Sequence, residues 1–171
     1  MKKMSPRLVV ALDVPSSSRA TSLVEHLAPL GVLFKVGYEA FYGYGDAIRE
    51  ALGSYEAGYA LDLKLHDIPN TVEAAVHNVV RPGVRLLTVH ALGGAQMLEA
   101  AVKAAQESAA ELSIPVPDVY AVTILTSIGA ADLGELGLAG GPGENAIRLA
   151  ALARDARCAG VVCSVREVAD L

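Results

Sequence analysis

The sequence predicts a single α/β domain in which short strands alternate with longer helices. Hydrophobic residues make up 53% of the 171 residues, and they follow strand spacing and helical spacing in turn along the chain. A chain of this length can bury one sizeable core, and a charged fraction of 19% is too low for a disordered protein. No low-complexity stretch or change of composition marks a linker, so we expect one domain over residues 1–171.

Each element of this prediction rests on local spacing. Short, mostly apolar runs predict strands at Leu8–Leu12, Val32–Val36, Ala60–Leu65, Val84–Val89, Val119–Leu125 and Gly160–Cys163. Between them, helical spacing and many alanines predict helices at Ser17–Leu27, Ala40–Leu52, Val72–Val80, Ala95–Leu112 and Asn145–Ala156. A repeated order of strand and helix indicates a parallel sheet. Periodicity alone leaves open whether the sheet is doubly wound or belongs to a (β/α)8 barrel, which needs more than six βα units to close.

The loops between these elements carry the expected punctuation. Ser16–Ser18 can cap the first helix, and Pro82 with Gly83 ends the third. The longest irregular segment, Gly129–Gly143, follows the fifth strand. Either a mobile active-site loop or a plain surface connection fits this segment.

Charge and targeting signals exclude several classes of protein. The net charge of -5 argues against a nucleic-acid or anionic-membrane surface, so we expect a small-molecule partner. After the basic segment Met1–Arg7, the apolar run Leu8–Leu12 is too short for a signal-peptide core or a membrane span, so we expect a cytoplasmic protein. Cys158 and Cys163 lack zinc-binding spacing and are predicted to be buried, free thiols.

Charged residues interrupt the predicted strands in a regular way. Strand alternation in the third strand would put its leucines on one face and Asp62, Lys64 and His66 on the other. Lys35 lies between two apolar residues of the second strand, and Asp13 ends the first strand. A charged face is unusual in a buried parallel sheet, and in a barrel such residues point into the mouth, where active sites lie.

Two interpretations fit the charges Asp13, Lys35, Asp62 and Lys64. They form either a coupled array suited to proton transfer and electrostatic catalysis, or a structural ion-pair network. Their recurrence at corresponding strand ends, with Asp67 just beyond, favours the catalytic interpretation. His66 and His90 are expected to be supporting hydrogen-bonded residues, and the aromatic cluster of Tyr38, Phe41, Tyr42 and Tyr44 to pack or to serve a subunit interface.

The run Asp62–Thr71 closely resembles the signature of the bacterial-type orotidine 5′-phosphate decarboxylase family, in which an Asp-x-Lys-x-x-Asp core precedes Ile-Pro-Asn-Thr. The other predicted strand ends resemble the family's in the correct order: Ala11–Asp13, Phe34–Gly37, Thr88–Gly94, Thr123–Ser127 and Gly160–Ser164.

The resemblance implies a (β/α)8 TIM barrel, of which about six βα units lie in this chain. It also implies a lyase that converts orotidine 5′-monophosphate to uridine 5′-monophosphate and carbon dioxide in pyrimidine biosynthesis, with no metal and no organic cofactor. The implied catalytic residues are Lys64, the proton donor to pyrimidine C6, with Asp62, Asp67 and Lys35.

The resemblance further implies contacts to the substrate and to a second subunit. Asp67, Ile68 and Thr71 would reach the partner's site in a homodimer. The implied substrate-binding residues are Asp13, Lys35, Asp62, Lys64, Asp67, Ile68, Asn70, Thr71, Thr126 and Ser127, of which Asp13 and Lys35 would contact the ribose and the last two the pyrimidine.

The resemblance ends near Ser164–Glu167. About two βα units of the family, including its phosphate-gripping segments, would follow. We therefore expect a C-terminally truncated chain, with no phosphate-binding residue to name. Two alternatives stay open: an inactive truncated relic, and a magnesium-dependent barrel that decarboxylates or cleaves a sugar phosphate. In the latter a glutamate stands at the position of Lys35.

Overall fold

A computed structural model describes residues 8–171 as an α/β fold with six strands in the consecutive order β1-β2-β3-β4-β5-β6. The strands are β1 (Val9–Ala11), β2 (Leu33–Val36), β3 (Tyr59–Leu65), β4 (Val84–His90), β5 (Asp118–Val122) and β6 (Gly160–Val162). The helices are α1 (Ser17–Leu27), α2 (Tyr38–Ser54), α3 (Pro69–Val79), α4 (Gly94–Leu112), α5 (Ala130–Glu135) and α6 (Pro142–Asp155), with 3-10 turns η1 (Ala28–Leu30) and η2 (Ala91–Gly93). The predicted basic segment at residues 1–7 lies outside the described residues.

The strand order decides between the two sheet types that the sequence left open. A doubly wound sheet reverses its strand order at a switch point. Here every strand neighbours the next one in sequence, and the pairs β1 with β2, β2 with β3, and β5 with β6 are parallel. This is the order of a (β/α)8 barrel.

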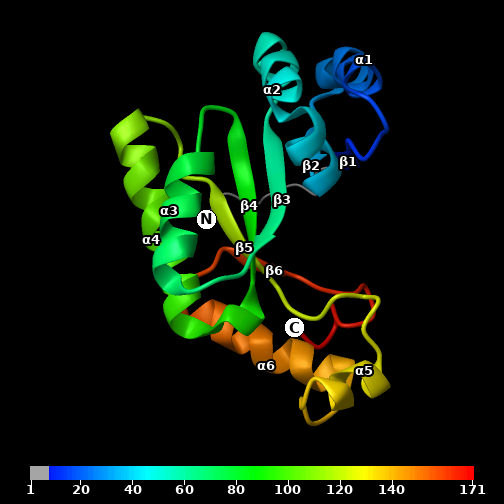
Figure 1. Cartoon of the computed structure of the whole chain (residues 1–171), viewed down its shortest axis with the longest axis vertical. Coiled ribbons are helices and arrows are strands. Elements are labelled where there is room, and N and C mark those ends of the chain that lie inside the picture. Colours follow the sequence, from blue (N-terminus) through cyan, green and yellow to red (C-terminus); the bar gives the residue numbers. More distant parts are fainter. Residues whose placement is uncertain (1–7) are drawn as a thin grey trace. The chain divides into compact units, whose positions relative to one another are not determined.

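The chain divides into two compact subdomains, Met1–Leu63 with Arg81–Leu87 and Lys64–Val80 with Thr88–Leu171. In the first, helices α1 and α2 lie against each other (Figure 1). Ser16 caps α1, as predicted, by accepting a hydrogen bond from the Arg19 amide at 3.4 Å. The largest fully buried side chains of this subdomain are Leu12, Val24, Phe34, Ile48, Leu52 and Leu87.

Helix α2 changes direction at Tyr44, whose backbone angles of -158° and 34° are not helical. Glycines flank this residue at positions 43 and 45. Glycine lowers helix propensity, so the sequence permits the interruption here. The Tyr44 hydroxyl donates to the Val14 carbonyl, and its second contact, 3.4 Å to the Leu12 carbonyl, also lies on the segment that follows β1.

In the second subdomain, α3 and α4 pack side by side (Figure 1). The largest fully buried side chains here are Val72, Val76, Val80, Met97, Leu98 and Leu133. Helix α3 begins with Pro69, which suits the first turn because its missing N–H would have no partner there.

The structure corrects two predicted segments. The segment predicted to be irregular, Gly129–Gly143, contains the short helix α5. Its start is fixed by a bond of 2.7 Å from the Gly129 amide to the Asp132 carboxylate. The fifth strand ends at Val122, three residues before the predicted end at Leu125. Among residues 8–171, no helix combines the length and the apolarity that crossing a membrane requires.

Candidate active site

The register of the first three strands explains why three charged residues meet. Lys35 on β2 pairs with Ala11 of β1 and with Ala60 of β3. Asp13 and Asp62 each lie two residues beyond these partners, so strand periodicity returns both carboxylates to the face of Lys35. A bond of 2.9 Å from the Leu12 amide to the Lys35 carbonyl extends the pairing past the end of β1.

The Lys35 ammonium group bridges the two carboxylates. Its Nζ atom lies 2.9 Å from Asp13 Oδ2 and 3.5 Å from Asp62 Oδ2. The Asp62 side chain is 19% exposed and that of Asp13 is 46% exposed, so one end of the cluster is shielded and the other is open to solvent. The first subdomain therefore holds a charged cluster at the carboxyl ends of three strands, and a ligand can reach it.

Gly37 leaves room for this cluster. A Cβ atom at position 37 would lie 3.0 Å from the Lys35 Nζ and 3.1 Å from Asp13 Oδ1. Both distances are closer than most side-chain contacts, so a larger residue would press on the ion pair. Glycine at this position follows from close approach rather than from an unusual backbone angle.

Lys64 lies two residues after Asp62, in the second subdomain, and has an unusual backbone. Its φ is 44°, in the left-handed region that residues other than glycine seldom adopt. Its amide donates to the Thr88 hydroxyl at 2.8 Å. Such strain clusters at functional sites, because the surrounding structure must hold it in place.

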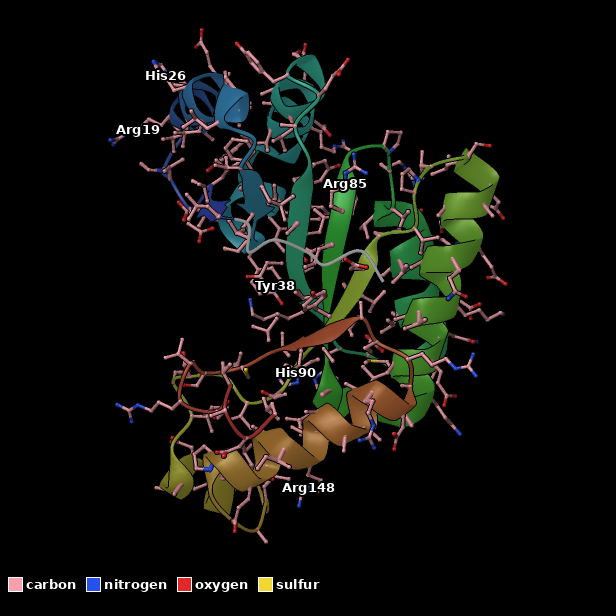
Figure 2. The ribbon with its side chains drawn as sticks, turned by 180° about the vertical axis from the view of Figure 1, so that it is seen from behind. Arg19, His26, Tyr38, Arg85, His90 and Arg148 are labelled. Atoms are coloured by element: carbon pink, nitrogen blue, oxygen red, sulfur yellow. The ribbon has the colours of Figure 1, made fainter. Side chains whose placement is uncertain are left out.

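His66 and His90 form a stacked pair in the same subdomain. Their ring centroids are 5.2 Å apart and their planes differ by 19°. Burial, together with the nearby His66 and Lys64, lowers the pKa of His90. The Nδ1 atom of His90 accepts a bond from the Leu92 amide at 3.4 Å, which fits a neutral imidazole (Figure 2 labels His90). These contacts fit the predicted supporting role.

The segment that begins α3 is exposed. Asp67, Ile68, Asn70 and Thr71 all face solvent, and the Ile68 side chain is 66% exposed. Asp67 Oδ1 accepts a bond of 2.6 Å from the Ile68 amide. These residues are therefore available to a ligand or to a second chain.

Thr126 and Ser127 lie farther from their strand than the sequence predicted. They are the central residues of a turn closed by a bond of 2.9 Å from the Ile128 amide to the Leu125 carbonyl. Both side chains are exposed, and the turn follows the end of β5 at Val122. They occupy a loop after a strand rather than the strand end itself.

Within residues 8–171, one group of side chains outside these positions could ligate a metal. Ligand atoms of Glu73, His77 and Glu107 lie within 4.8 Å of one another. The Lys103 ammonium group lies 3.6 Å from Glu73 and 3.5 Å from Glu107, so a cation of the chain already balances both carboxylates. This arrangement fits an ionic network that joins α3 to α4.

The two cysteines are free thiols, as predicted, but neither is fully buried. Both are half-exposed near β6 and the end of α6. Burial still raises the pKa of Cys158 to about 11. This thiol is therefore protonated near neutral pH and is a poor nucleophile.

Parallel strands in consecutive order, with ionised side chains at their carboxyl ends, define this protein as a barrel enzyme of the (β/α)8 class. The sequence places it within that class. It belongs to the orotidine 5′-phosphate decarboxylase / HUMPS family, whose sequence model matches residues 6–171.

Curated relatives agree on the branch of the family. Orotidine 5′-phosphate decarboxylase from Paramagnetospirillum magneticum is 46% identical over 159 residues, which cover 93% of this chain and 68% of the relative. The protein of the same name from Anaeromyxobacter sp. (strain K) is 46% identical and covers 98% of this chain and 70% of that relative. These relatives are carboxy-lyases by name.

Solved structures confirm the predicted barrel fold. The crystal structure of orotidine 5′-phosphate decarboxylase from Lactobacillus acidophilus matches with a TM-score of 0.85 and 34% identity, over 96% of this chain and 74% of that one. An uncharacterized conserved protein from Geobacillus kaustophilus matches with a TM-score of 0.88 and 39% identity, over 95% and 75% of the two chains. The chain thus contains about six βα units of this barrel, the sixth of which is represented by strand β6.

Two residues that the sequence did not single out for a site role, Tyr38 and Thr88, contact the backbone of Leu63 and Lys64. The Tyr38 hydroxyl donates to the Leu63 carbonyl at 2.7 Å. Tyr38 lies at the start of α2 and is labelled in Figure 2. The Thr88 hydroxyl accepts from Lys64, as described above. Both are side-chain bonds to backbone groups, and no sequence spacing predicts them.

Proposed function

We propose that this protein converts orotidine 5′-monophosphate to uridine 5′-monophosphate and carbon dioxide, a step of de novo pyrimidine biosynthesis. The observation that supports this most is the Lys35 ammonium group between the carboxylates of Asp13 and Asp62. The strand end Phe34–Gly37, which contains Lys35, resembles the corresponding strand end of the decarboxylase family, and the curated relatives carry that name.

Lys64 is the proposed catalytic acid. When the bond from C6 to the carboxylate breaks, its electron pair stays on C6 and carbon dioxide leaves. A nearby ammonium group stabilises that negative charge and then gives a proton to C6. Lysine suits this role better than arginine, whose guanidinium holds its proton too tightly.

Asp62 is proposed to lie beside the departing carboxylate, within a catalytic array that also contains Lys35, Lys64 and Asp67. Two roles fit its charge. It repels the substrate carboxylate before the bond breaks, or it fixes Lys64 through charge attraction. Its low exposure supports either role, because a shielded charge acts more strongly than a solvated one.

The remaining proposed contacts to the substrate come mostly from residues whose side chains are exposed to solvent. Asp13 and Lys35 contact the ribose, and the half-exposed Asp13 is open to such a ligand. Asn70, Thr126 and Ser127 contact the substrate, the latter two at the pyrimidine, and their side chains are exposed.

The proposal includes a homodimer in which Asp67, Ile68 and Thr71 reach the partner's site. The exposure of Ile68, at 66%, supports this, because an apolar side chain at a helix start gains from burial against a second chain. A cytoplasmic location is also proposed. It is supported by the two free thiols, which a reducing compartment preserves.

A metal-free reaction is proposed over the magnesium-dependent alternative. The Lys35 ammonium group lies between the two carboxylates that a divalent cation would use, and its charge repels one. A glutamate at this position would instead add a third oxygen ligand.

The test follows the absorbance of orotidine 5′-monophosphate with the 171-residue chain, with and without EDTA, and separately offers a sugar phosphate with magnesium. Loss of orotidine 5′-monophosphate absorbance that survives EDTA is the expected result. Turnover only of the sugar phosphate with magnesium would establish the alternative reaction. Turnover of neither, by chain shown to be folded by circular dichroism, would make this polypeptide an inactive relic.

A further inference from the structure

The peptide group between Leu63 and Lys64 is bonded by side chains at both ends. Its carbonyl accepts from the Tyr38 hydroxyl at 2.7 Å, and its amide donates to the Thr88 hydroxyl at 2.8 Å. Two hydroxyls from distant parts of the sequence thus bind the two ends of this one peptide.

This peptide directly precedes Cα of Lys64, the residue of β3 with the most unusual backbone conformation. Lys64 has a φ of 44°, whereas left-handed angles are uncommon for a residue with a Cβ atom. The angle turns the bond from Cα to Cβ, and with it the direction in which the lysine side chain leaves the strand. Hydrogen bonds at both ends of this peptide plane therefore help to fix the direction in which the Lys64 side chain leaves the backbone.

The two hydroxyls are well suited to hold a plane. Thr88 is 3% exposed and β-branched, so its side chain has few rotamers and no competing bulk water. Tyr38 belongs to the first turn of α2, and its rigid ring sets the hydroxyl position with only two rotatable bonds.

We propose that Thr88 and Tyr38 are positioning residues that hold the peptide between Leu63 and Lys64, and thereby aim the Lys64 ammonium group at the reacting carbon. This rests on the proposed function for its catalytic consequence. The structural half, that two hydroxyls fix this peptide, stands independently of any substrate.

The test compares variants that remove or retain each hydroxyl. Thr88→Val and Tyr38→Phe remove it, while Thr88→Ser keeps it. Matched controls are Thr123→Val, which removes a buried hydroxyl that bonds to the Val162 carbonyl at 3.1 Å, and Tyr42→Phe, on the exposed side of α2.

A spectroscopic readout isolates this peptide. The sequence contains one leucine followed by lysine, at Leu63 and Lys64. Labelling leucine with 13C at the carbonyl and lysine with 15N therefore gives a single HNCO cross-peak. Its amide proton shift and exchange rate report the bond to Thr88, and its carbonyl shift reports the bond to Tyr38.

We expect Thr88→Val to speed exchange of the Lys64 amide by about tenfold, and Tyr38→Phe to move the Leu63 carbonyl shift, because each loses a hydrogen bond. Each should lower kcat for orotidine 5′-monophosphate by about tenfold with KM changed less than about twofold. Thr88→Ser should restore both readouts, and the two control variants should leave both at wild-type values.

Cross-peak shifts and exchange rates that do not change in Thr88→Val and Tyr38→Phe would overturn the proposal. So would a loss of kcat equal to that in Thr123→Val. If wild-type protein does not turn over orotidine 5′-monophosphate, the proposed function fails, and the cross-peak alone decides whether the two hydroxyls hold this peptide.

Discussion

Lys35 forms two ion pairs, and we expect the longer one, with Asp62, to have the larger coupling free energy. Lys35 Nζ is 2.9 Å from Asp13 and 3.5 Å from Asp62. With an effective dielectric constant of about 20, these separations correspond to attractions of about 6 and about 5 kcal/mol, before solvation is considered. Distance alone thus ranks the pair with Asp13 slightly ahead.

Solvent exposure reverses this order. The Asp13 side chain is 46% exposed and that of Asp62 is 19% exposed. Water screens an exposed ion pair to about 0.5 kcal/mol, whereas a close ion pair with less access to water can contribute about 1.5 kcal/mol or more. We therefore expect a coupling free energy of about 0.5 kcal/mol between Lys35 and Asp13, and about 1.5 kcal/mol between Lys35 and Asp62.

Double-mutant cycles measured by urea denaturation test this expectation. The variants are Lys35→Met, Asp13→Asn and Asp62→Asn, with the two double variants. A matched control cycle uses Lys103 and Glu107 on α4, which are also 3.5 Å apart but are 64% and 44% exposed. A coupling free energy with Asp62 that is no larger than that with Asp13, or no larger than that of the control pair, would show that solvent exposure does not set the strength of these ion pairs.

Three further perturbations follow from the structure. Gly37→Ala should lower kcat about tenfold, because the added Cβ atom would press on the Lys35 ammonium group. A Cβ atom at position 43 would meet no atom within 4 Å, so Gly43→Ala should keep kcat and raise the free energy of unfolding by about 0.5 kcal/mol. Equal kcat in the two variants would contradict this. Burial raises the pKa of Cys158 from 9.0 to about 11, so the folded thiol holds its proton more tightly than the unfolded one. The free energy of unfolding should therefore fall as the pH rises from 9.0 to about 11. Urea denaturation at several pH values should show that Cys158→Ala removes this decline. Burial lowers the pKa of His90 from 6.5, so the unfolded chain binds this proton more readily than the folded one. The free energy of unfolding should therefore fall as the pH drops from 6.5 toward the pKa of the folded state. If the free energy of unfolding of His90→Gln depends on pH as steeply as that of the wild type, His90 is not the cause.

The regular parts of the fold were predictable from local spacing. The first helix matches its predicted bounds, Ser17–Leu27, because a serine cap and an apolar face mark both its start and its length. The third strand was predictable because alternation separates buried Leu61 and Leu63 from half-exposed Asp62 and Lys64. The cluster of Asp13, Lys35 and Asp62 then follows from parallel register, which aligns strand ends.

Other features have no local signal. Helix α5 was missed because it is short and its surroundings are rich in glycine, which predicts irregular backbone. The φ of Lys64 was not predictable, because lysine shows no preference for left-handed backbone and only its neighbours hold it there. The bonds from Tyr38 and to Thr88 join residues far apart in sequence, and a hydroxyl bonded to backbone leaves no pattern.

Lys64 is proposed to deliver the proton in the decarboxylation. The most direct test compares initial rates of orotidine 5′-monophosphate loss for the wild type, Lys64→Ala and Lys103→Ala, a lysine on α4 outside the proposed site. Lys103→Ala should keep the wild-type rate, and Lys64→Ala should lower the rate by about a thousandfold or more, as expected for removal of a general acid. A Lys64→Ala rate equal to that of Lys103→Ala would rule out Lys64 as the proton donor.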